Sequence, residues 1–392
     1  MQHARVDIAI FGGGIAGLWA LARLRQVGFS AVLFESNALG GVQSMASQGI
    51  IHGGAKYALS GNLTESARAI AEMPAIWKSC LRGEGELDLS AVKILSEHQY
   101  LWSTTSLVSR MAGFFAGKMM RSRMAQVAEG DRPKLFQHPG FHGTLYRLEE
   151  QVLDVSSLVR ALSDQFGDHC YQLEDGQFRF DRGEDGSHLI SVPDHDLNIE
   201  AKSLILAAGK GNTDLLRKLG RDRPAMQLRP LHMAITKGDL PDIHAHCLGS
   251  GSTPRITITS ASMADGGRVW YLGGQIAESG VDCSPDELID IAKRELAELL
   301  PWVDLTNTEW STLRVDRAEP KTAGGMRPES CFLASDDGVL TVWPTKLAFA
   351  PRLAQEIVTS LEKDGVAPQQ ADMQGLDRLP KPDLAVPPWE LT

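Results

Sequence analysis

Residues 12 to 17 read Gly12-Gly13-Gly14-Ile15-Ala16-Gly17, which matches the pattern G-x-G-x-x-G. The apolar run Val6–Phe11 comes directly before this turn, and Ile15–Val27 follows it with apolar residues at helical spacing. A second apolar run, Ala31–Glu35, completes a β-α-β unit within the first 35 residues. This order of strand, glycine-rich turn, helix and strand is typical of a dinucleotide-binding unit.

Each glycine of the pattern has a physical role in such a unit. Gly12 permits the tight turn, Gly14 lets the backbone approach a pyrophosphate, and Gly17 allows close packing of helix against strand. The diphosphate is expected on the positive end of the helix, at Ile15 and Ala16.

An acidic residue stands where such a unit binds a ribose. Glu35 ends the second strand, 21 residues after Gly14, where a carboxylate accepts a hydrogen bond from a ribose 2′-OH. A carboxylate there repels a 2′-phosphate, so NADP is disfavoured. Ser36 follows and is included in the predicted cofactor site. The motif alone does not separate FAD from NAD.

Length and composition describe a folded, acidic protein. The chain has 392 residues, 43% of them hydrophobic and 22% charged, with a formal net charge of −10. These values exclude wholesale disorder and allow two or three domains. The acidic balance argues against a nucleic-acid partner, which needs a basic patch.

Cysteine usage and hydropathy indicate the compartment. The five cysteines are odd in number, scattered and without a C-x-x-C pair, so we predict a reducing, cytoplasmic environment without structural disulfides. The uncharged stretch Ile8–Ala22 is too short to span a bilayer and contains three consecutive glycines. We interpret it as strand, turn and helix.

We predict an α/β fold in which a Rossmann-like cofactor domain is interleaved with an α+β substrate domain built on a mixed sheet. Nucleotide-type signals occur at the start, near 200–212 and near 338–360. The cofactor domain is therefore assigned to 1–75, 150–225 and 316–365, and the substrate domain to 76–149 and 226–315. The proline-rich tail 366–392 is expected to lie extended on the surface.

Three helix boundaries carry clear signals. Asp154 is expected to cap a helix that ends near residue 166. Ser284 opens a capping box, with proline at the first helical position, for a helix to about residue 300. Pro351 fits only the first turn of a helix, which predicts a last helix from about 349 to 363.

The residues after the glycine-rich turn separate the cofactors through a family resemblance. Segment 40–57 resembles the FAD-contacting segment of the D-amino-acid-oxidase-like flavoenzymes, which include glycine and sarcosine oxidases and FAD-dependent glycerol-3-phosphate dehydrogenases. Ile51-His52-Gly53-Gly54, followed by Lys56-Tyr57, is most similar to the glycerol-3-phosphate dehydrogenase version, which usually has arginine where Lys56 stands.

Three later segments extend this resemblance. Leu204–Gly209 resembles the family's strand whose backbone approaches the flavin, and Pro344–Ala348 resembles the loop that faces its pyrimidine edge. Trp310–Arg314 resembles the Gly-x-Arg-Pro element whose arginine clamps the substrate anion, with Thr312 and Val315 replacing the glycine and proline. The resemblance implies one non-covalently bound FAD per chain. Its predicted contacts are Gly12, Gly14, Ile15, Ala16, Gly17, Glu35, Ser36, Ser44, Gly49, Ile51, Ala208, Gly209, Thr345, Lys346 and Leu347.

Three residues, His52, Arg314 and Lys346, are predicted to act at the catalytic centre, Arg314 as the clamp for the substrate anion. Hydride transfer to a flavin leaves negative charge near N1 and O2, which Lys346 and the helix N-terminus behind it would stabilise. His52 is placed to polarise or deprotonate a substrate N–H or O–H, the alternative being a core histidine.

The substrate is predicted to be a small anion, because a partly buried arginine is the natural bidentate clamp for a carboxylate or phosphate. Arg314 is the first candidate for this clamp, with Arg317 and Arg327 as rivals. The resemblance adds Lys56 and Tyr57 to the substrate site. An amino acid, an N-methyl amine, a 2-hydroxy acid and a polyol phosphate all remain open, as does the electron acceptor.

Three functions compete. The first is a flavin-dependent dehydrogenase or oxidase that acts on a C–H bond next to an amine or hydroxyl. The second is an NAD(P)H-dependent flavin monooxygenase. Against it, the Gly-Asp pair that is typical of aromatic hydroxylases is missing from the region of Asp336-Asp337-Gly338. The third is a non-catalytic flavoprotein. A second dinucleotide motif, needed for a glutathione-reductase-like enzyme, is absent from the sequence.

No metal site is predicted. His244 and His246 have the spacing to chelate a metal from one strand, but no pattern of carboxylates or cysteines completes the site, so surface histidines are favoured.

Segment 106–124 combines Phe114 and Phe115 with Arg110, Lys118, Arg121 and Arg123, and it has no acidic residue. Its interpretations are an amphipathic core helix, a flap over the substrate pocket, or an interfacial helix on anionic lipid. The last suits a membrane-associated dehydrogenase that reduces quinone, as the glycerol-3-phosphate relatives do.

Overall fold

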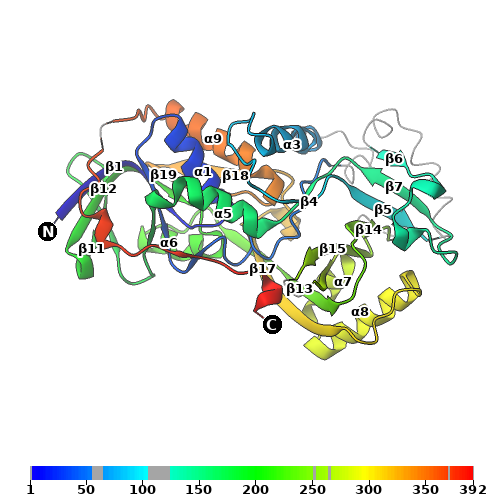
Figure 1. Ribbon diagram of the computed structural model, residues 1–392. Coiled ribbons are helices and arrows are strands. Elements are labelled where there is room, and N and C mark those ends of the chain that lie inside the picture. The colour runs from blue at the N-terminus through cyan, green and yellow to red at the C-terminus, as the bar shows by residue number, and fades with distance from the viewer. Residues whose placement is uncertain are drawn as a thin grey trace.

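The computed structural model describes residues 2–54, 65–104, 124–249, 253–263, 266–369 and 371–391, with side chains from residue 70 onward in the second range. The chain builds an elongated molecule with a large sheet in each half (Figure 1). Helices α1 (Ile15–Gln26), α3 (Glu65–Leu81) and α9 (Ala350–Lys363) lie together over one face of the first half. The fold is mixed α/β, as predicted.

The first sheet has eight strands within the described residues, in the order β10-β11-β12-β1-β2-β9, with β19 beside β12 and β18 beside β19. Strands β19, β12, β1, β2 and the edge strand β9 are parallel, and the apolar runs of β1, β2 and β12 fit a sheet that is buried on both faces. The strands are β1 (Gln2–Phe11), β2 (Ala31–Glu35), β9 (Cys170–Gln172), β10 (Arg179–Arg182), β11 (His188–Val192), β12 (Leu197–Leu206), β18 (Phe332–Asp336) and β19 (Val339–Trp343).

The second sheet also has eight strands in the described part of the chain, in the order β17-β13-β16-β15-β14-β5-β7-β6. Its long strands pair antiparallel, so one face packs on helices while the other is available to a site. The strands are β5 (Gln99–Ser103), β6 (Met124–Gln126), β7 (Thr144–Leu148), β13 (Met226–Gly238), β14 (Ala245–Cys247), β15 (Ile256–Ser262), β16 (Arg268–Gly273) and β17 (Glu309–Pro320).

Shorter elements complete the fold. Two small strand pairs join β3 (Ala38–Leu39) to β20 (Asp383–Leu384) and β4 (Ile94–Ser96) to β8 (Val152–Leu153). The remaining α-helices of the described ranges are α5 (Val155–Phe166), α6 (Asn212–Lys218), α7 (Gln275–Ser279) and α8 (Pro285–Leu299).

The predicted helix boundaries are confirmed. The Asp154 carboxylate accepts backbone N–H bonds from Ser156 and Ser157 at the start of α5. At α8 both hydrogen bonds of the Ser284–Glu287 capping box form. These caps satisfy backbone N–H groups that a helix leaves without an intrahelical acceptor.

The C-terminal tail differs from the extended surface segment that was predicted. Leu376 and Leu379 are only 1% and 3% exposed, and they pack into the core beside the first sheet. Asp383 and Leu384 add a short strand beside β3. Prolines reduce regular hydrogen bonding, but the leucines between them bury enough apolar surface to hold the tail on the domain.

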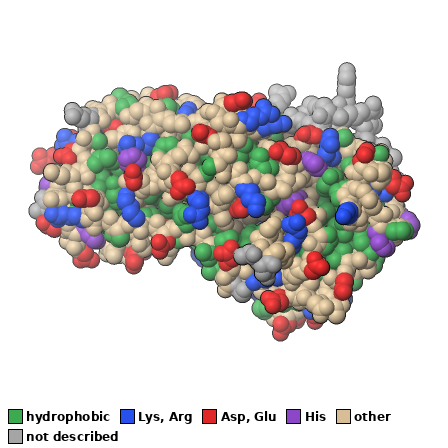
Figure 2. Space-filling view, viewed as in Figure 1, with side chains coloured by type: hydrophobic (Ala, Val, Ile, Leu, Met, Phe, Trp, Pro, Cys, Tyr) green, Lys and Arg blue, Asp and Glu red, His purple; other side chains and the backbone are tan. Residues whose placement is uncertain are grey.

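In the described residues no helix is long and apolar enough to cross a membrane. All five cysteines have reduced thiols. Acidic and basic side chains are interspersed over the face in Figure 2.

Candidate functional site

A cavity of about 1370 Å³ joins the two halves of the molecule. At one end it is lined by the turn after β1 and by Glu35 at the end of β2. At the other end its walls are strands β13, β14, β15 and β17 of the second sheet. The cavity therefore extends from the dinucleotide motif to side chains of the second sheet.

The glycines at the start of the cavity are required by close backbone approach. Gly12 has a φ of +111°, and a Cβ on it would lie 2.5 Å from the Cα of Ala208. A Cβ on Gly17 would overlap the carbonyl oxygen of Gly12, so Gly17 packs in the turn and does not line the cavity. The predicted roles of both glycines in packing fit this geometry.

Polar groups fix the N-terminus of α1 and the end of β2. The Ser44 hydroxyl accepts the backbone N–H of Ile15 at 2.9 Å. The Glu35 carboxylate accepts the N–H of Gly13 at 2.5 Å and that of Asn37 at 2.9 Å. Gly14, Ala16 and Ser36 line the cavity beside them. The arrangement presents a helix N-terminus and a carboxylate to one ligand.

The chain also approaches the cavity through strained loops. Val42 has a φ of +53°, unusual for a β-branched residue, and 73% of its side chain is exposed where it lines the cavity. Thr345 has a φ of +59°, and its hydroxyl donates to the Ser330 carbonyl at 2.9 Å. Backbone strain of this kind clusters where a ligand is held.

Lys346 and Leu347 lie at the N-terminal end of the last helix and line the cavity. The Lys346 side chain is only 8% exposed, and its Nζ lies 4.9 Å from the ring centre of Phe349. On the adjoining wall, the indole N–H of Trp343 donates to the carbonyl of Gly209 at 3.0 Å. This contact holds the segment after β12 against the end of β19, where Ala208, Gly209 and Gly49 also line the cavity.

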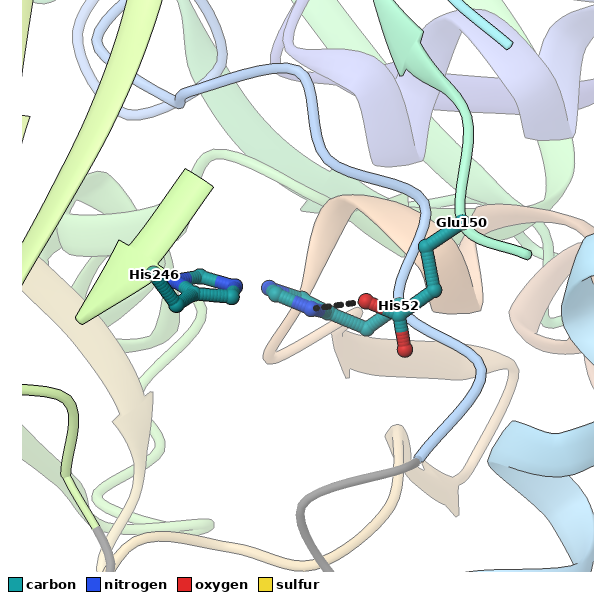
Figure 3. Close-up of side chains that lie close together, drawn as sticks. All are labelled: His52, Glu150 and His246. Atoms are coloured by element: carbon teal, nitrogen blue, oxygen red, sulfur yellow. Dashed lines mark hydrogen bonds and ion pairs between the residues drawn. The ribbon is translucent and has the colours of Figure 1, made fainter. Parts of the chain in front are cut away.

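His52 lies in the cavity wall between two other titratable side chains, Glu150 and His246 (Figure 3). Its Nδ1 is 3.4 Å from a carboxylate oxygen of Glu150, whose other oxygen accepts the N–H of Gly53 at 2.8 Å. The imidazoles of His52 and His246 have centres 6.1 Å apart and planes within 16°. The three side chains offer metal-type ligand atoms within 4.8 Å of one another, and the His52–Glu150 contact also joins two of them directly.

Arg229 of β13 and Arg317 of β17 line the second-sheet wall of the cavity, and Arg327 lines the cavity from the segment after β17. Arg229 and Arg317 face the shared carboxylate of Glu278 at 3.7 and 3.8 Å. Arg229 also lies 3.6 Å from Glu319, which is 3% exposed. Burial, followed by the charges of Arg229 and Arg327, lowers the pKa of Arg317 to about 10. Crowded cations of this kind favour an added anion.

The structure does not bring every predicted residue to the cavity. Arg314 lies outside it, and its guanidinium donates to the carbonyls of Val281 and Cys283. Its rival Arg317 lines the cavity instead, because the two side chains leave opposite faces of β17. Ile51 is core, 1% exposed, and does not line the cavity. Lys56 and Tyr57 lie outside the described residues.

The expectation that His244 and His246 are surface residues is wrong. They are only 5% and 2% exposed, so both side chains are buried. Glu150, Arg229 and Glu278 are not among the site residues predicted from the sequence. The alternation Arg229-x-Leu231-x-Met233, which lines the cavity from β13, is the signal that identifies one of them. No motif marks Glu150, which is brought to His52 by the fold alone.

Comparison with known proteins agrees with this geometry. The family described as "DAO: FAD dependent oxidoreductase" matches residues 7–345. The chain is 49% identical over 392 residues to the probable FAD-dependent oxidoreductase PA4991 of Pseudomonas aeruginosa, covering 100% of this chain and 99% of that one. The chain therefore belongs to the DAO family of FAD-dependent oxidoreductases.

Solved structures show the same fold. The crystal structure of PA4991 superposes with a TM-score of 0.86 at 44% identity, covering 100% of this chain and 99% of that chain. Glycine oxidase from Geobacillus kaustophilus gives 0.64 at 15% identity, covering 95% and 98%. L-α-glycerophosphate oxidase from Mycoplasma pneumoniae gives 0.63 at 14%, covering 98% and 100%.

The cavity fits the cofactor of this family. A bound FAD would cover three features of the cavity. They are the glycine-rich turn after β1, where an added Cβ would clash, the Glu35 carboxylate and the exposed Val42. The protein is an FAD-dependent oxidoreductase, and this confirms the predicted cofactor and enzyme class.

Proposed function

We propose that this enzyme oxidises a small anion at a C–H bond next to a hydroxyl or amine. The observation that carries the proposal is the surplus of positive charge on the substrate wall of the cavity. Arg229 and Arg317 lie near two carboxylates, Glu278 and Glu319, while Arg327 and Lys346 add two further positive charges to the same cavity. A carboxylate or phosphate would balance this charge.

Arg317 is the proposed anion clamp. Its Nε donates to the Arg229 carbonyl at 3.2 Å, which fixes the guanidinium plane while its terminal nitrogens lie at the cavity. A fixed, partly buried guanidinium loses little further entropy when it binds a carboxylate or phosphate in bidentate fashion. Arg229 and Arg327 supply the surrounding positive potential.

His52 is the proposed acceptor for the substrate proton. Bound FAD would supply the hydride acceptor, so the hydrogen of the C–H bond would leave the substrate together with both bonding electrons. The O–H or N–H bond breaks as well, its proton passes to His52, and its electron pair forms the C=O or C=N bond of the product. Lys346 is proposed to stabilise the negative charge that arises at the cofactor's pyrimidine edge.

The names of the structural neighbours support the range of substrates. Glycine oxidase and L-α-glycerophosphate oxidase share the fold, and their names give an amino acid and a polyol phosphate as substrates. Both compounds carry an anionic group, a carboxylate or a phosphate, and have a C–H bond beside an amine or hydroxyl.

Anaerobic reduction of the bound flavin tests the proposal. The FAD-loaded enzyme is mixed with an α-amino acid, an N-methyl amino acid, a 2-hydroxy acid and a polyol phosphate, each beside its neutral amide or dephosphorylated analogue. We expect at least one anion to bleach the flavin absorbance, with its neutral analogue at least ten times less effective at equal concentration. Faster bleaching by the neutral analogues, or by NADH alone, would overturn the proposal.

We further propose peripheral contact with anionic lipid through segment 106–124. Residues 105–123 lie outside the described residues, so the proposal rests on sequence alone: Phe114 and Phe115 among basic residues, without an acid. We expect co-sedimentation with anionic vesicles that Phe114→Ser with Lys118→Glu abolishes. Equal recovery in the supernatant with and without vesicles would exclude it.

A further inference from the structure

We propose that His246 and His52 hold the substrate proton as a pair, and that Glu150 fixes the tautomer of His52. This inference rests on the proposed function, in which a proton leaves the substrate at this site. It gives His246 the role of sharing the proton and Glu150 the role of positioning His52. Neither role is predicted from the sequence.

Glu150 determines which nitrogen of His52 acts as a base. An ionised carboxylate only accepts hydrogen bonds, so the Nδ1 of His52, 3.4 Å from it, is the N–H of the neutral ring. The remaining lone pair is therefore on Nε2. The carboxylate is 6% exposed and is held by the Gly53 N–H at 2.8 Å, which fixes its position relative to His52. It also stabilises the imidazolium after proton transfer.

The opposite end of His52 meets His246. Figure 3 shows the His52 ring between the Glu150 carboxylate and the His246 ring, with a ring nitrogen of each histidine directed at the other. Their centres are 6.1 Å apart with planes within 16°, and both residues line the cavity. A substrate hydroxyl or amine bound beside His52 would therefore lie near the imidazoles of both His52 and His246.

The Nε2 of His246 can accept or donate a hydrogen bond, because the contact at its Nδ1 is with the hydroxyl of Thr257. Its Nδ1 lies 2.7 Å from the Thr257 hydroxyl, which can donate or accept. This contact is compatible with either tautomer of His246, whereas the carboxylate permits one tautomer of neutral His52. The proton that leaves the substrate O–H or N–H is therefore taken by His52 and shared with His246, and no other bond to the pair is made or broken.

Coupled titration of the two histidines tests this pairing without knowledge of the substrate. The FAD-loaded enzyme, labelled with ¹⁵N-histidine, is titrated by NMR as wild type, His246→Gln and His244→Gln. In the described part of the chain, the Glu150 carboxylate lies beside the pair and Lys346 lines the same cavity. We expect His246→Gln to move the His52 midpoint by about 0.5 pH unit or more, because two imidazoles in contact resist double protonation.

His244→Gln is the matched control, since this buried histidine lies two residues away and does not line the cavity. It should leave the His52 midpoint unchanged. If His246→Gln does not fold with FAD, Thr257→Val removes the anchor at Nδ1 and should shift the His246 midpoint instead. Glu150→Gln should lower the His52 midpoint by about one unit or more.

Identical His52 titration in wild type and His246→Gln would overturn the proposal. A tightly held metal ion, at one equivalent per chain and lost from both Glu150→Gln and His246→Gln, would also overturn it in favour of a metal site. These outcomes are distinct from failure of the proposed function, which shows as no flavin bleaching by any anion, or as faster bleaching by the neutral analogues or by NADH alone. Where an anion does bleach the flavin, His246→Gln should slow the reduction at least tenfold while its apparent affinity changes little.

Discussion

Arg314 and Arg317 leave opposite faces of strand β17, although only two residues separate them. Arg317 lines the cavity, whereas Arg314 donates to the carbonyls of Val281 and Cys283 beside α8. Side chains alternate along a strand, so residues an odd number apart face opposite ways. The different surroundings of these two arginines follow from their position on the strand, because their side chains are the same.

Arg317→Met should therefore weaken the apparent affinity for the anionic substrate by about 100-fold, equivalent to about 3 kcal/mol for a lost charge-assisted pair. Methionine keeps most of the apolar volume of the side chain. The measurement is the concentration dependence of anaerobic flavin reduction with the anion that bleaches best.

Arg314→Met is the control for that experiment. It removes the same charge from the same strand, outside the cavity, and should leave the apparent affinity within about twofold. A larger effect from Arg314→Met than from Arg317→Met would return the clamp to Arg314.

Gly14→Val should abolish FAD binding. Gly14 lines the cavity at the N-terminus of α1, and a Cβ there already lies 3.2 Å from the Ser44 hydroxyl. The two methyl groups of valine would occupy the path of the pyrophosphate. We expect a colourless protein whose FAD content after gel filtration is below about a tenth of wild type. Gly130→Val, at a glycine with nothing within 4 Å of its Cβ, should retain its FAD.

The sequence predicts the elements of this site well wherever local patterns determine them. The Gly12–Gly17 turn, the cap at Asp154 and the capping box at Ser284 depend on residues close in the chain, and all three form. The glycines permit a tight turn, and the capping side chains accept hydrogen bonds from backbone N–H groups at a helix start. Both requirements are local and are the same in any fold.

The substrate side of the site depends instead on contacts between distant segments. His52 and Glu150 are separated by 98 residues, and no pattern in either segment shows that they meet. Arg317 could not be separated from Arg314 without the phase of β17, since a shift of one residue exchanges the two faces. Ile51 was assigned to the cofactor by resemblance, yet the neighbouring Ile50 lines the cavity instead.

Lys346→Met should make the bound flavin harder to reduce. The Lys346 side chain is nearly buried on the cavity and, in the proposed function, balances negative charge on the reduced cofactor. Loss of about 1.4 to 3 kcal/mol of this stabilisation lowers a two-electron midpoint potential by about 30 to 60 mV. The potential is measured by anaerobic reduction against a reference dye.

Lys210→Met provides the comparison. Lys210 also lines the cavity, but it is exposed and paired with Asp316 at 2.8 Å, so solvent and its partner already screen its charge. We expect its midpoint potential to stay close to wild type. Equal potentials for wild type and Lys346→Met would show that Lys346 does not act on the cofactor.

His188 should make the protein sensitive to acid. Burial, and next the charge of Arg182, lowers the pKa of His188 from 6.5 to about 4. Arg182 NH1 lies 3.4 Å from its Nε2, and arginine only donates, so that nitrogen accepts and the folded ring is neutral. The unfolded chain takes up a proton below about pH 6.5. The stabilisation from neutral His188 is therefore complete above that pH and is lost as the pH falls towards about 4.

His188→Gln should remove this part of the pH dependence, because glutamine fills a similar space and does not titrate. Between about pH 7.5 and about pH 4.5, the free energy of unfolding of wild type should fall by about 2 kcal/mol more than that of His188→Gln. Urea denaturation followed by circular dichroism at both pH values measures the difference. His142→Gln, at an exposed histidine, should follow wild type. If His188→Gln loses as much stability as wild type over this range, the buried ring is not the group that responds to acid.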